Sequence, residues 1–472
     1  MSDTIDPIEL NMRVASRAHV GDTHILLVHY LSALSMVIPG QGFSVYSVGG
    51  SGKGKTHASK AVFDLFNDDL KLPMSTNSST ALNYWFNEAM NPAILFWSEM
   101  TLDPKDEKSM GIMRSLLDNS KNFHLVSEKN EKGKWVAKKV LLPQNCPCWF
   151  NSVAPIRDSD GQMLNRVLLV NPNESKEQDE KVHSFNYERL FHQKNTKDPE
   201  LAIARQVNGK IINAGPREVF IPIPEQDFIF PNKSNRRNLP KLATMIKSVV
   251  VARQDNRLYI PEEEPNTRPP ILLAEPEDVE LALWAYNQIA DTNNAQVSQG
   301  ALEILELVPT SIDGSKDSIG KTALSDLSGK KADRVSRLCK ELVLAGMIEW
   351  KREADRSFVY WRTSRHRGFS SACRVEWSNI TAKSVFGQLE AFSASRYGNM
   401  EGMAEYLQRW DVANHSPYFP ISTPRWLNDL LSANGITITD SISARHDKTN
   451  HAEMPTSSTE DEIPSEEVAI IK

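Results

Sequence analysis

A glycine-rich octapeptide follows a short β-rich run, Phe43–Val48, and opens a helical stretch, Lys55–Phe66. It matches the pattern G-x-x-x-x-G-K-[ST], and its residues are Gly49, Gly50, Ser51, Gly52, Lys53, Gly54, Lys55 and Thr56. In this pattern backbone N–H groups turn towards phosphate oxygens, and the positive end of the helix dipole lies behind them. Lys55 can reach the β and γ phosphates, and the Thr56 hydroxyl can coordinate Mg²⁺. The position between a strand and a helix favours this phosphate site over a flexible Gly/Ser loop.

Short apolar runs alternate with helical patterns on both sides of this motif. The runs are Phe43–Val48, Ala93–Trp97, Cys148–Val153 and Val167–Val170, and further strand-like pieces are expected within Gln206–Asp227. Helical spacing marks Val20–Ile38 and Leu239–Arg253. Such alternation predicts an α/β fold, with a mostly parallel sheet covered by helices.

Composition limits the kind of protein that carries this fold. With 472 residues, 40% of them hydrophobic, the chain can bury the cores of several domains. The net charge of −6 excludes a protein that coats nucleic acid through overall positive charge, so such contacts come from local patches. Without an apolar run of roughly 18 residues or a signal peptide at the acidic start, we expect a cytoplasmic protein. The spacing of Cys146 and Cys148 resembles half of a metal site. Because no second cysteine pair completes such a site, we expect both to be buried strand residues.

Polar residues lie at the ends of three of these runs. Glu99 follows the second run and is placed to polarise an attacking water, although Ser98 stands where an aspartate commonly holds the Mg²⁺ shell. Asn151, with Ser152 as the second choice, can position that water, as in ATPases with an added sensor strand. Arg166 opens the last run, where an arginine can reach the γ-phosphate of a neighbouring protomer. A surface glutamate, a polar strand end and a salt-bridged surface arginine are the plainer alternatives.

The order of these elements resembles the AAA+ ATPases and, more narrowly, the MCM-like helicases, including those of bacterial and archaeal mobile elements. The resemblance covers about Arg13–Arg253 and rests on the N-terminal helical run, the glycine-rich motif, a hairpin before the sensor strand, and the segments NRVLLV and RRNLPKL. It implies an AAA+ P-loop ATPase core with a helical lid, where Arg236 or Arg237 is a sensor-2 arginine acting on a neighbour. It also implies ATP and Mg²⁺ as cofactors and a homo-oligomer, expected to be a hexamer.

A predicted β-hairpin is the first candidate for DNA contact. Two strand-like runs, Phe123–Lys129 and Lys134–Leu142, flank a turn signal at residues 130–133. In the family that the chain resembles, this hairpin points into a central channel. Lys132 and Lys134 would then hold the phosphates of a single strand, whereas the alternative is a solvated surface hairpin.

A predicted winged helix is the second candidate. Its pattern is a helix at Ile319–Leu327, a turn, a recognition-type helix at Lys331–Leu344 and a basic hairpin. Lys330–Arg367 carries eleven Lys and Arg against five Asp and Glu, so this part is basic within an acidic chain. The expected contacts with duplex DNA are Lys331, Arg334, Lys351 and Arg352. A winged helix that binds protein is the alternative.

Together these patterns predict five parts. They are a motor with N-terminal helices and lid (1–258), a linker (259–270), the winged-helix domain (271–366), a helical region (367–442) and a disordered acidic tail (443–472). The favoured hypothesis is an ATP-driven, ring-shaped DNA helicase of a mobile element's replication system. The alternative, favoured by Ser98, is an AAA+ replication initiator or regulatory switch that binds DNA without unwinding it. A superfamily 3 viral-type helicase is a third hypothesis, which the position of the hairpin and the segment RRNLPKL disfavour.

Overall fold

The computed structural model describes residues 6–74, 93–100, 107–118, 123–141, 144–153, 162–191, 198–230, 237–260, 270–295, 297–311, 317–345, 347–353, 357–362, 372–392 and 402–415. Its centre is one parallel sheet with the strand order β2-β3-β6-β1-β7. The strands are β1 (Ser44–Val48), β2 (Lys71–Met74), β3 (Ile94–Trp97), β6 (Cys148–Ser152) and β7 (Val167–Val170). The predicted α/β fold class is therefore confirmed, with β6 lying between β3 and β1, the strand that leads into the glycine-rich loop.

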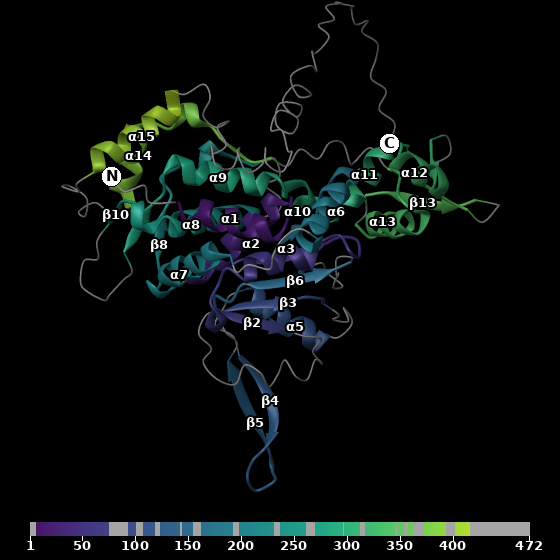
Figure 1. Cartoon of the computed structure of the whole chain (residues 1–472), viewed down its shortest axis with the longest axis horizontal. Coiled ribbons are helices and arrows are strands. Elements are labelled where there is room, and N and C mark those ends of the chain that lie inside the picture. Colours follow the sequence, from purple (N-terminus) through teal and green to yellow (C-terminus); the bar gives the residue numbers. More distant parts are fainter. Residues whose placement is uncertain are drawn as a thin grey trace, which may run out of the picture.

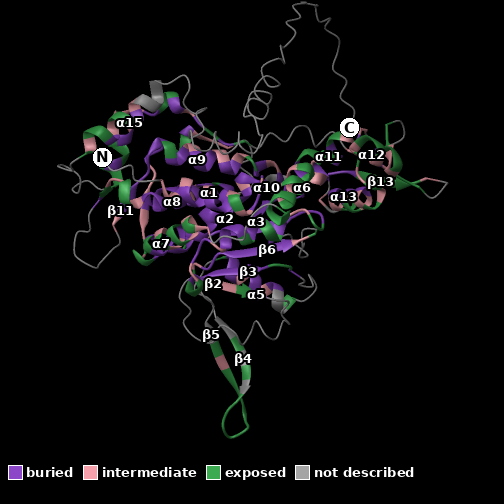
Figure 2. Cartoon of the chain, viewed as in Figure 1, coloured by how far each residue is buried: buried purple, intermediate pink, exposed green. Residues whose placement is uncertain are grey.

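Helices cover both faces of this sheet, because alternate residues of each strand point to opposite sides. On one face Val45, Trp149 and Leu168 pack in a core with α1 (Pro7–Ala18), α2 (Thr23–Leu34) and α3 (Lys55–Phe63). Much of the surface of these helices is buried (Figure 2). On the other face Tyr46 and Phe150 pack against α5 (Glu107–Leu117). Cys146 and Cys148 are both buried in this second core, as expected, but only Cys148 lies in a strand, since Cys146 precedes β6.

Four further helices extend the first core, and they are α7 (Pro199–Asn213), α8 (Asn238–Ala252), α9 (Pro276–Asn287) and α10 (Ala290–Ala295). The helix α6 (Lys176–Phe191) is mostly exposed, and Gln178 is its one buried residue. The strand-like interpretation of Gln206–Asp227 is wrong for its first part, which belongs to α7, and right for β8 (Glu218–Phe220). The smaller strands nearby are β9 (Phe228–Ile229), β10 (Tyr259–Ile260) and β11 (Ile271–Leu273), and β11 pairs with both β8 and β10.

A buried ion cluster joins the N-terminus, α8 and α9. Arg253 donates to Asp6 Oδ2 over 2.7 Å and to Asp278 Oδ1 over 2.8 Å. Arg257 donates to the same Asp278 oxygen over 2.6 Å. Burial alone would raise the pKa of Asp278, but the two arginines more than offset it, so that this pKa lies below its usual range. The cluster therefore fixes α9 on α8 only while Asp278 is ionised.

A smaller unit with its own hydrophobic core follows α10. It contains α11 (Gln299–Leu307), α12 (Lys321–Ser328), α13 (Ala332–Leu344) and a sheet of β12 (Ile319–Gly320), β13 (Glu349–Arg352) and β14 (Phe358–Trp361). Gly329 ends α12 with a φ of 64°, a left-handed conformation that suits glycine. The elements follow the order that was predicted for a winged helix. The predicted domain 271–366 also includes α9, which packs in the first core and not in this smaller unit. The limits of the domain therefore stay a prediction.

The last described elements return to the first core. β15 (Arg374–Val375) pairs with β9, and α14 (Ala382–Phe392) and α15 (Met403–His415) bury Leu389 and Trp410 there. The predicted linker residues 261–269 and the predicted tail 443–472 lie outside the described residues. As predicted, β4 (Phe123–Lys129) and β5 (Trp135–Leu141) form a two-stranded hairpin. This hairpin extends away from the rest of the molecule (Figure 1).

Candidate nucleotide site and DNA-binding surfaces

The glycine-rich loop has the geometry of a phosphate cradle. Gly52 and Gly54 have φ values of 76° and 87°, the left-handed conformation that suits glycine and that lets the loop turn sharply before α3. Lys55 begins α3, and its Nζ donates to the carbonyl oxygens of Gly49 and Gly50 over 2.9 and 2.7 Å. Burial lowers the pKa of Lys55, whereas the nearby Glu174 raises it. A phosphate group would replace the two carbonyls as the partner of this ammonium group, so the residues fit a nucleotide.

The residues after β3 face the start of α3. Thr56 is exposed, and its Oγ1 donates to the backbone oxygen of Ser98 over 3.2 Å. The exposed Glu99 is near enough to raise the pKa of Lys55. Thr56 and Glu99 therefore lie on one side of the phosphate cradle, where a hydroxyl ligand for Mg²⁺ and a carboxylate for an attacking water are needed. Ser98 adds a carbonyl oxygen but no charge.

Asn151 reaches the same place from the added strand. Because β6 pairs with β1 in the register Ser47–Asn151, Asn151 lies beside the end of the P-loop strand. Asn151 Nδ2 donates to Thr56 Oγ1 over 3.3 Å, and Asn151 Oδ1 accepts from Ser59 Oγ over 3.2 Å. Ser152, the second choice, is hydrogen-bonded to Tyr46 over 2.8 Å. The geometry thus favours Asn151 over Ser152 as the residue next to the nucleotide.

A buried polar network stands behind Asn151, and sequence reasoning missed it. Ser59, on α3, lies 3.1 Å from His29 Nε2, and Ser47 lies 3.4 Å from the same nitrogen. His29 Nδ1 lies 2.8 Å from the backbone oxygen of Ile25. Burial lowers the pKa of His29 to about 4, so this ring is neutral at pH 7. One signal was available: Ser59 follows Lys55 by four residues and shares its helix face.

The predicted arginines lie at the opposite end of the sheet. Arg166 donates to both carboxylate oxygens of Asp118 over 2.7 and 3.0 Å, and Arg237 lies 3.6 Å from the same carboxylate. Arg236 lies outside the described residues. Beside them Lys241 donates to the backbone oxygen of Val167 over 2.7 Å, and burial, assisted by Arg237, lowers its pKa to about 7. These groups line a hollow of about 470 Å³.

The strand register shows that Arg166, Arg237 and Lys241 lie at the other end of the sheet from the phosphate cradle of the same chain. Val167, which follows Arg166, pairs with Ser44 at the start of β1. The cradle follows Val48 at the other end of β1, four residues away, or about 13 Å of strand. Arg166 and Arg237 therefore lie far from their own Lys55 and face a different surface of the protomer.

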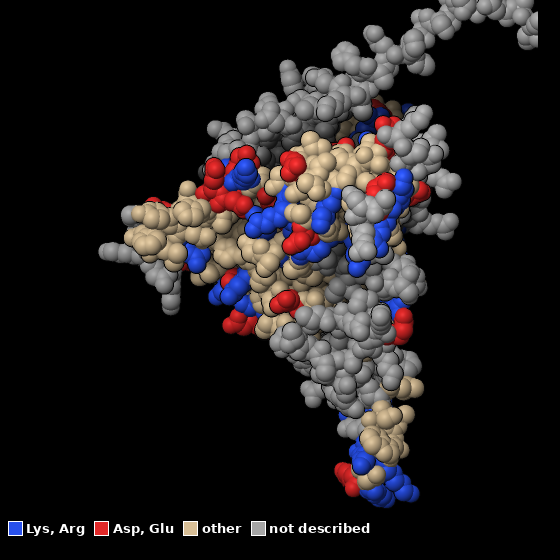
Figure 3. Space-filling view, turned by 90° about the vertical axis from the view of Figure 1, so that its right-hand side faces the viewer, with Lys and Arg blue, Asp and Glu red and all other residues tan. Residues whose placement is uncertain are grey.

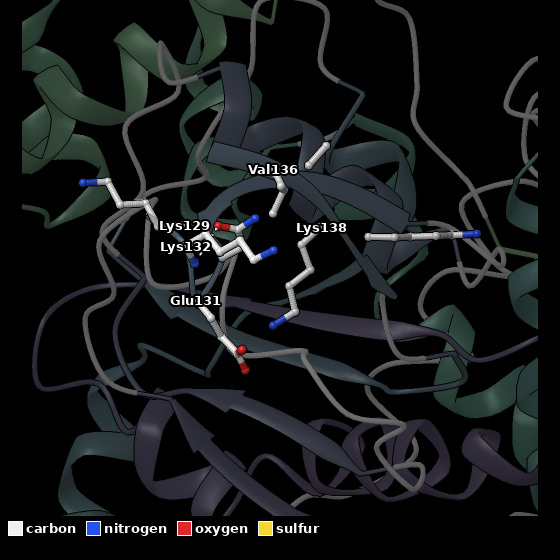
Figure 4. A pocket seen from close by; sticks show the side chains of 8 residues that line it. Lys129, Glu131, Lys132, Val136 and Lys138 are labelled. Atoms are coloured by element: carbon white, nitrogen blue, oxygen red, sulfur yellow. Dashed lines mark hydrogen bonds between the residues drawn. The ribbon is translucent and has the colours of Figure 1, made fainter. Parts of the chain in front are cut away.

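The hairpin carries its lysines on exposed backbone. Lys132 and Lys134 are both exposed, and Asn130 Oδ1 accepts from their backbone N–H groups over 3.1 and 3.0 Å, which fixes the turn. Lys129, Lys132 and Lys138 are among the side chains around an open hollow of about 810 Å³ (Figure 4). The tip gathers positive charge in the space-filling view (Figure 3).

The candidate contacts of the smaller unit differ in their surroundings. Lys331, Lys351 and Arg352 are exposed, with Lys351 paired to Glu353 over 3.2 Å. Arg334 is instead half-buried and pairs with Glu174, in the segment that follows β7.

Glu174 also holds the P-loop. Its Oε1 accepts from the backbone N–H of Gly50 over 2.6 Å. A Cβ on Gly50 would lie 2.7 Å from Arg334 Nη1, so only glycine leaves room for this guanidinium group. Sequence reasoning had no signal for this bridge, because its three residues come from distant segments. Arg334 thus connects α13 with the nucleotide site.

Comparisons with known proteins agree with the first of these sites. A family model described as "MTBMA_p00010 P-loop domain" matches residues 2–213. This match and the geometry of Gly49–Thr56 identify a nucleotide-binding P-loop domain in this chain. A search of curated proteins found no match.

Several solved structures match this chain. One of them is that of the Orc1 protein of Aeropyrum pernix in complex with DNA, with 11% sequence identity, 77% of this chain and 91% of that chain covered, and a TM-score of 0.22. A likeness at this identity and TM-score is too weak to assign a function. In the part of the chain that the structure describes, no helix has the length and apolar character needed to cross a membrane.

Proposed function

We propose that this protein is a ring-forming, ATP-driven DNA motor of the MCM-like helicase type, which hydrolyses ATP between protomers. The observation that carries the proposal is the separation of Arg166 and Arg237 from their own phosphate cradle by the length of β1. Two arginines that share one carboxylate at a protomer edge can reach a nucleotide only if a second copy of the chain brings one. Six copies would close such a ring, as in the family that the sequence resembles.

Each residue of the cradle then has a distinct task. Bound ATP and Mg²⁺ would supply the γ-phosphoryl group and the charge that neutralises it. Lys55 and Thr56 would hold them in the same protomer. Glu99 would accept the proton of the attacking water, and Asn151 would fix the position of that water. Arg166, and Arg237 or Arg236, would stabilise charge from the neighbouring protomer.

DNA contact is assigned to the hairpin and to the smaller unit. Lys132 and Lys134 would hold the phosphates of a single strand, because both are exposed at the tip of a projecting hairpin. Lys331, Lys351 and Arg352 would contact duplex phosphates from the wing and its neighbouring helix. Replacing Lys132 and Lys134 with alanine should flatten the salt dependence of single-strand binding by roughly 0.7 in log–log slope per lost contact.

Mixed assemblies test the shared site. Lys55→Ala and Arg166→Ala proteins should each be inactive as ATPases, whereas a mixture should regain activity because some interfaces pair an intact cradle with an intact arginine. Mixtures of Lys55→Ala with Glu99→Gln are the matched control, because both changes damage the same half-site and no interface is repaired. A strictly monomeric wild-type protein with full ATPase activity would contradict the proposal.

The second candidate is an AAA+ initiator or switch that binds DNA without unwinding it. Ser98 favours it, because a serine in place of an aspartate lowers the negative charge near Mg²⁺ and suits slow turnover. Strand displacement, measured together with ATPase activity with and without single-stranded DNA, separates the two candidates. A motor unwinds a forked duplex, whereas a switch binds it and leaves it paired.

A further inference from the structure

Among the described side chains of the projecting hairpin, three large apolar ones are exposed, namely Val136, at 42%, and two that are exposed further. Trp135, at the start of β5, is 68% exposed, and Leu125, on β4, is 67% exposed. Most of the other tryptophans that the structure describes, such as Trp97, Trp149 and Trp410, are buried. An exposed tryptophan leaves a large apolar surface in water, which is unfavourable for the free protein. Binding of a ligand to the ring would remove this surface from water.

The strand register places both residues on one face. Trp135 pairs with Lys129, Ala137 with Ser127 and Lys139 with Leu125, and these pairs share a side of the two-stranded sheet. Lys129 Nζ lies 5.2 Å from the centre of the Trp135 ring, a cation–π distance that orients the ring but leaves most of it exposed. This face, called here the Trp135 face, thus combines an aromatic ring, small side chains and a lysine at either end.

The positive charge around the Trp135 face indicates that its ligand is an anion. Residues 129–139 contain five lysines and one glutamate, which makes this segment basic within an acidic chain. An anion with flat apolar groups matches such a surface better than a protein segment does. Single-stranded nucleic acid has both features, because its phosphates are charged and its bases are unpaired. In a duplex the base faces are stacked on each other and are not accessible.

We propose that Trp135 stacks on a base of single-stranded nucleic acid while the surrounding lysines hold its phosphates. The proposal rests on the assignment of the hairpin to a single strand under the proposed function, and it adds a contact to the bases. The next pair on this face, Ser127 and Ala137, has small side chains beside the ring. Stacking of this kind is tolerant of sequence, since every base has an aromatic face.

An abasic strand tests the stacking directly. Full-length protein is titrated with oligothymidylate and with an abasic backbone of equal length and charge. Wild type should bind the oligothymidylate roughly 5- to 150-fold more tightly, the range that corresponds to about 1–3 kcal/mol for stacking on one aromatic residue. Trp135→Ala should bind the two strands equally, and Trp135→Phe should keep most of the preference. Tyr259→Ala, which removes an aromatic side chain that is 52% exposed on β10, is the matched control and should keep it all.

The lysine variant separates the two levels of the proposal. Lys132→Ala with Lys134→Ala should weaken binding of both strands and leave their ratio unchanged. If that variant loses affinity but wild type does not distinguish the strands, the stacking proposal is wrong and the assignment of the hairpin stands. If the lysine variant binds as wild type does, the hairpin assignment itself is wrong. If Trp135→Ala dissociates the assembly and keeps the preference for bases, the Trp135 face is a contact between protomers, and the stacking proposal is overturned.

Discussion

Ser59 connects the nucleotide site with the interior of the protein. Its hydroxyl lies 3.1 Å from the backbone oxygen of Lys55, 3.2 Å from Asn151 Oδ1 and 3.1 Å from His29 Nε2. The residue is fully buried, so water cannot replace these partners. Ser59 is therefore a positioning residue, which holds the Asn151 amide beside Thr56 without touching the nucleotide.

We predict that Ser59→Ala lowers kcat for ATP hydrolysis by roughly tenfold, the effect expected for one lost buried hydrogen bond. Nucleotide affinity should change little, because Lys55 and the loop are intact. Steady-state ATPase assays and binding of a fluorescent ATP analogue measure the two quantities. The loss should be absent in an Asn151→Ala background, because Ser59 acts through that residue.

Ser47→Ala is the matched control for this prediction. Ser47 is buried and its Oγ lies 3.4 Å from His29 Nε2. Although its backbone pairs with that of Asn151, its hydroxyl makes no hydrogen bond to the Asn151 side chain among the described residues. It should leave kcat close to that of wild type. Equal losses for Ser47→Ala and Ser59→Ala would show that the network acts through stability and not through Asn151.

Glu99→Gln should keep nucleotide binding and stop turnover, because an amide cannot accept the proton of the attacking water. We expect a decrease in kcat of roughly two to four orders of magnitude with an unchanged dissociation constant for ATP. Glu107→Gln, in the next helix, removes an exposed carboxylate paired with Arg114 and is the control. Persistent turnover in Glu99→Gln would move the role of base to another carboxylate.

At the residue scale, the sequence predicts the parts of the site that lie within continuous motifs. The geometry of Gly49–Thr56 and the approach of Asn151 to Thr56 agree with local patterns of strand, turn and polar residue. His29 and Glu174 could not be predicted, because each comes from a segment whose local pattern gives no function. Their roles depend on how distant segments pack.

At the element scale, four strands of the central sheet were predictable because each is a short apolar run with a polar or glycine-rich end. The edge strand β2 was not predicted, because its sequence KLPM contains a lysine and a proline and only Met74 is buried. A second difference is α7, where Val207, Ile211 and Ile212 favour a strand by residue type. Their spacing of four and one fits a helix equally well. Packing of α7 against α1 decides the matter, since Asn208 donates to Asn11 over 2.8 Å in the buried contact between the two helices.

The ion cluster gives a prediction about how these elements are held together. Asp278→Asn should lower the free energy of unfolding at pH 7 by about 3 kcal/mol, because Arg253 and Arg257 then lack a buried counter-charge. Thermal or urea denaturation measures the change. Asp255→Asn is the control, since it removes an exposed partner of Lys210 and should change stability by less than about 1 kcal/mol.

The pH dependence of this effect has a definite sign. The pKa of Asp278 is depressed in the folded protein, so its contribution is fully present above the usual value of 3.8 and is lost as the pH falls through the folded pKa. The difference in stability between wild type and Asp278→Asn should therefore be largest near neutral pH and decrease in acid below about pH 4. A difference that grows on acidification would contradict the role assigned to the ionised carboxylate.

At the scale of the whole molecule, the nucleotide site and the smaller unit meet at one place. The segment after β7 reaches the P-loop twice, through Glu174 at Gly50 and through Asp179, which accepts from Lys53 over 2.8 Å. Arg334 of α13 pairs with Glu174 from the other side. An arginine that was predicted to bind DNA is thus paired with Glu174 beside the phosphate cradle, so the predicted contact of Arg334 with DNA would require it to leave Glu174.

We predict that Glu174→Gln increases the affinity for duplex DNA by roughly three- to tenfold in the absence of nucleotide. The glutamine keeps an oxygen for the Gly50 N–H group but loses the ion pair, worth about 1 kcal/mol for a half-buried pair, which frees Arg334 for a DNA phosphate. Fluorescence anisotropy with a labelled duplex, with and without a non-hydrolysable ATP analogue, measures the effect. In wild type the analogue should change duplex affinity, whereas in Glu174→Gln it should not. Asp179→Asn loosens the same segment without touching α13 and should behave as wild type; an equal gain in that variant, or no gain in Glu174→Gln, would mean that the Arg334 bridge does not couple the two sites.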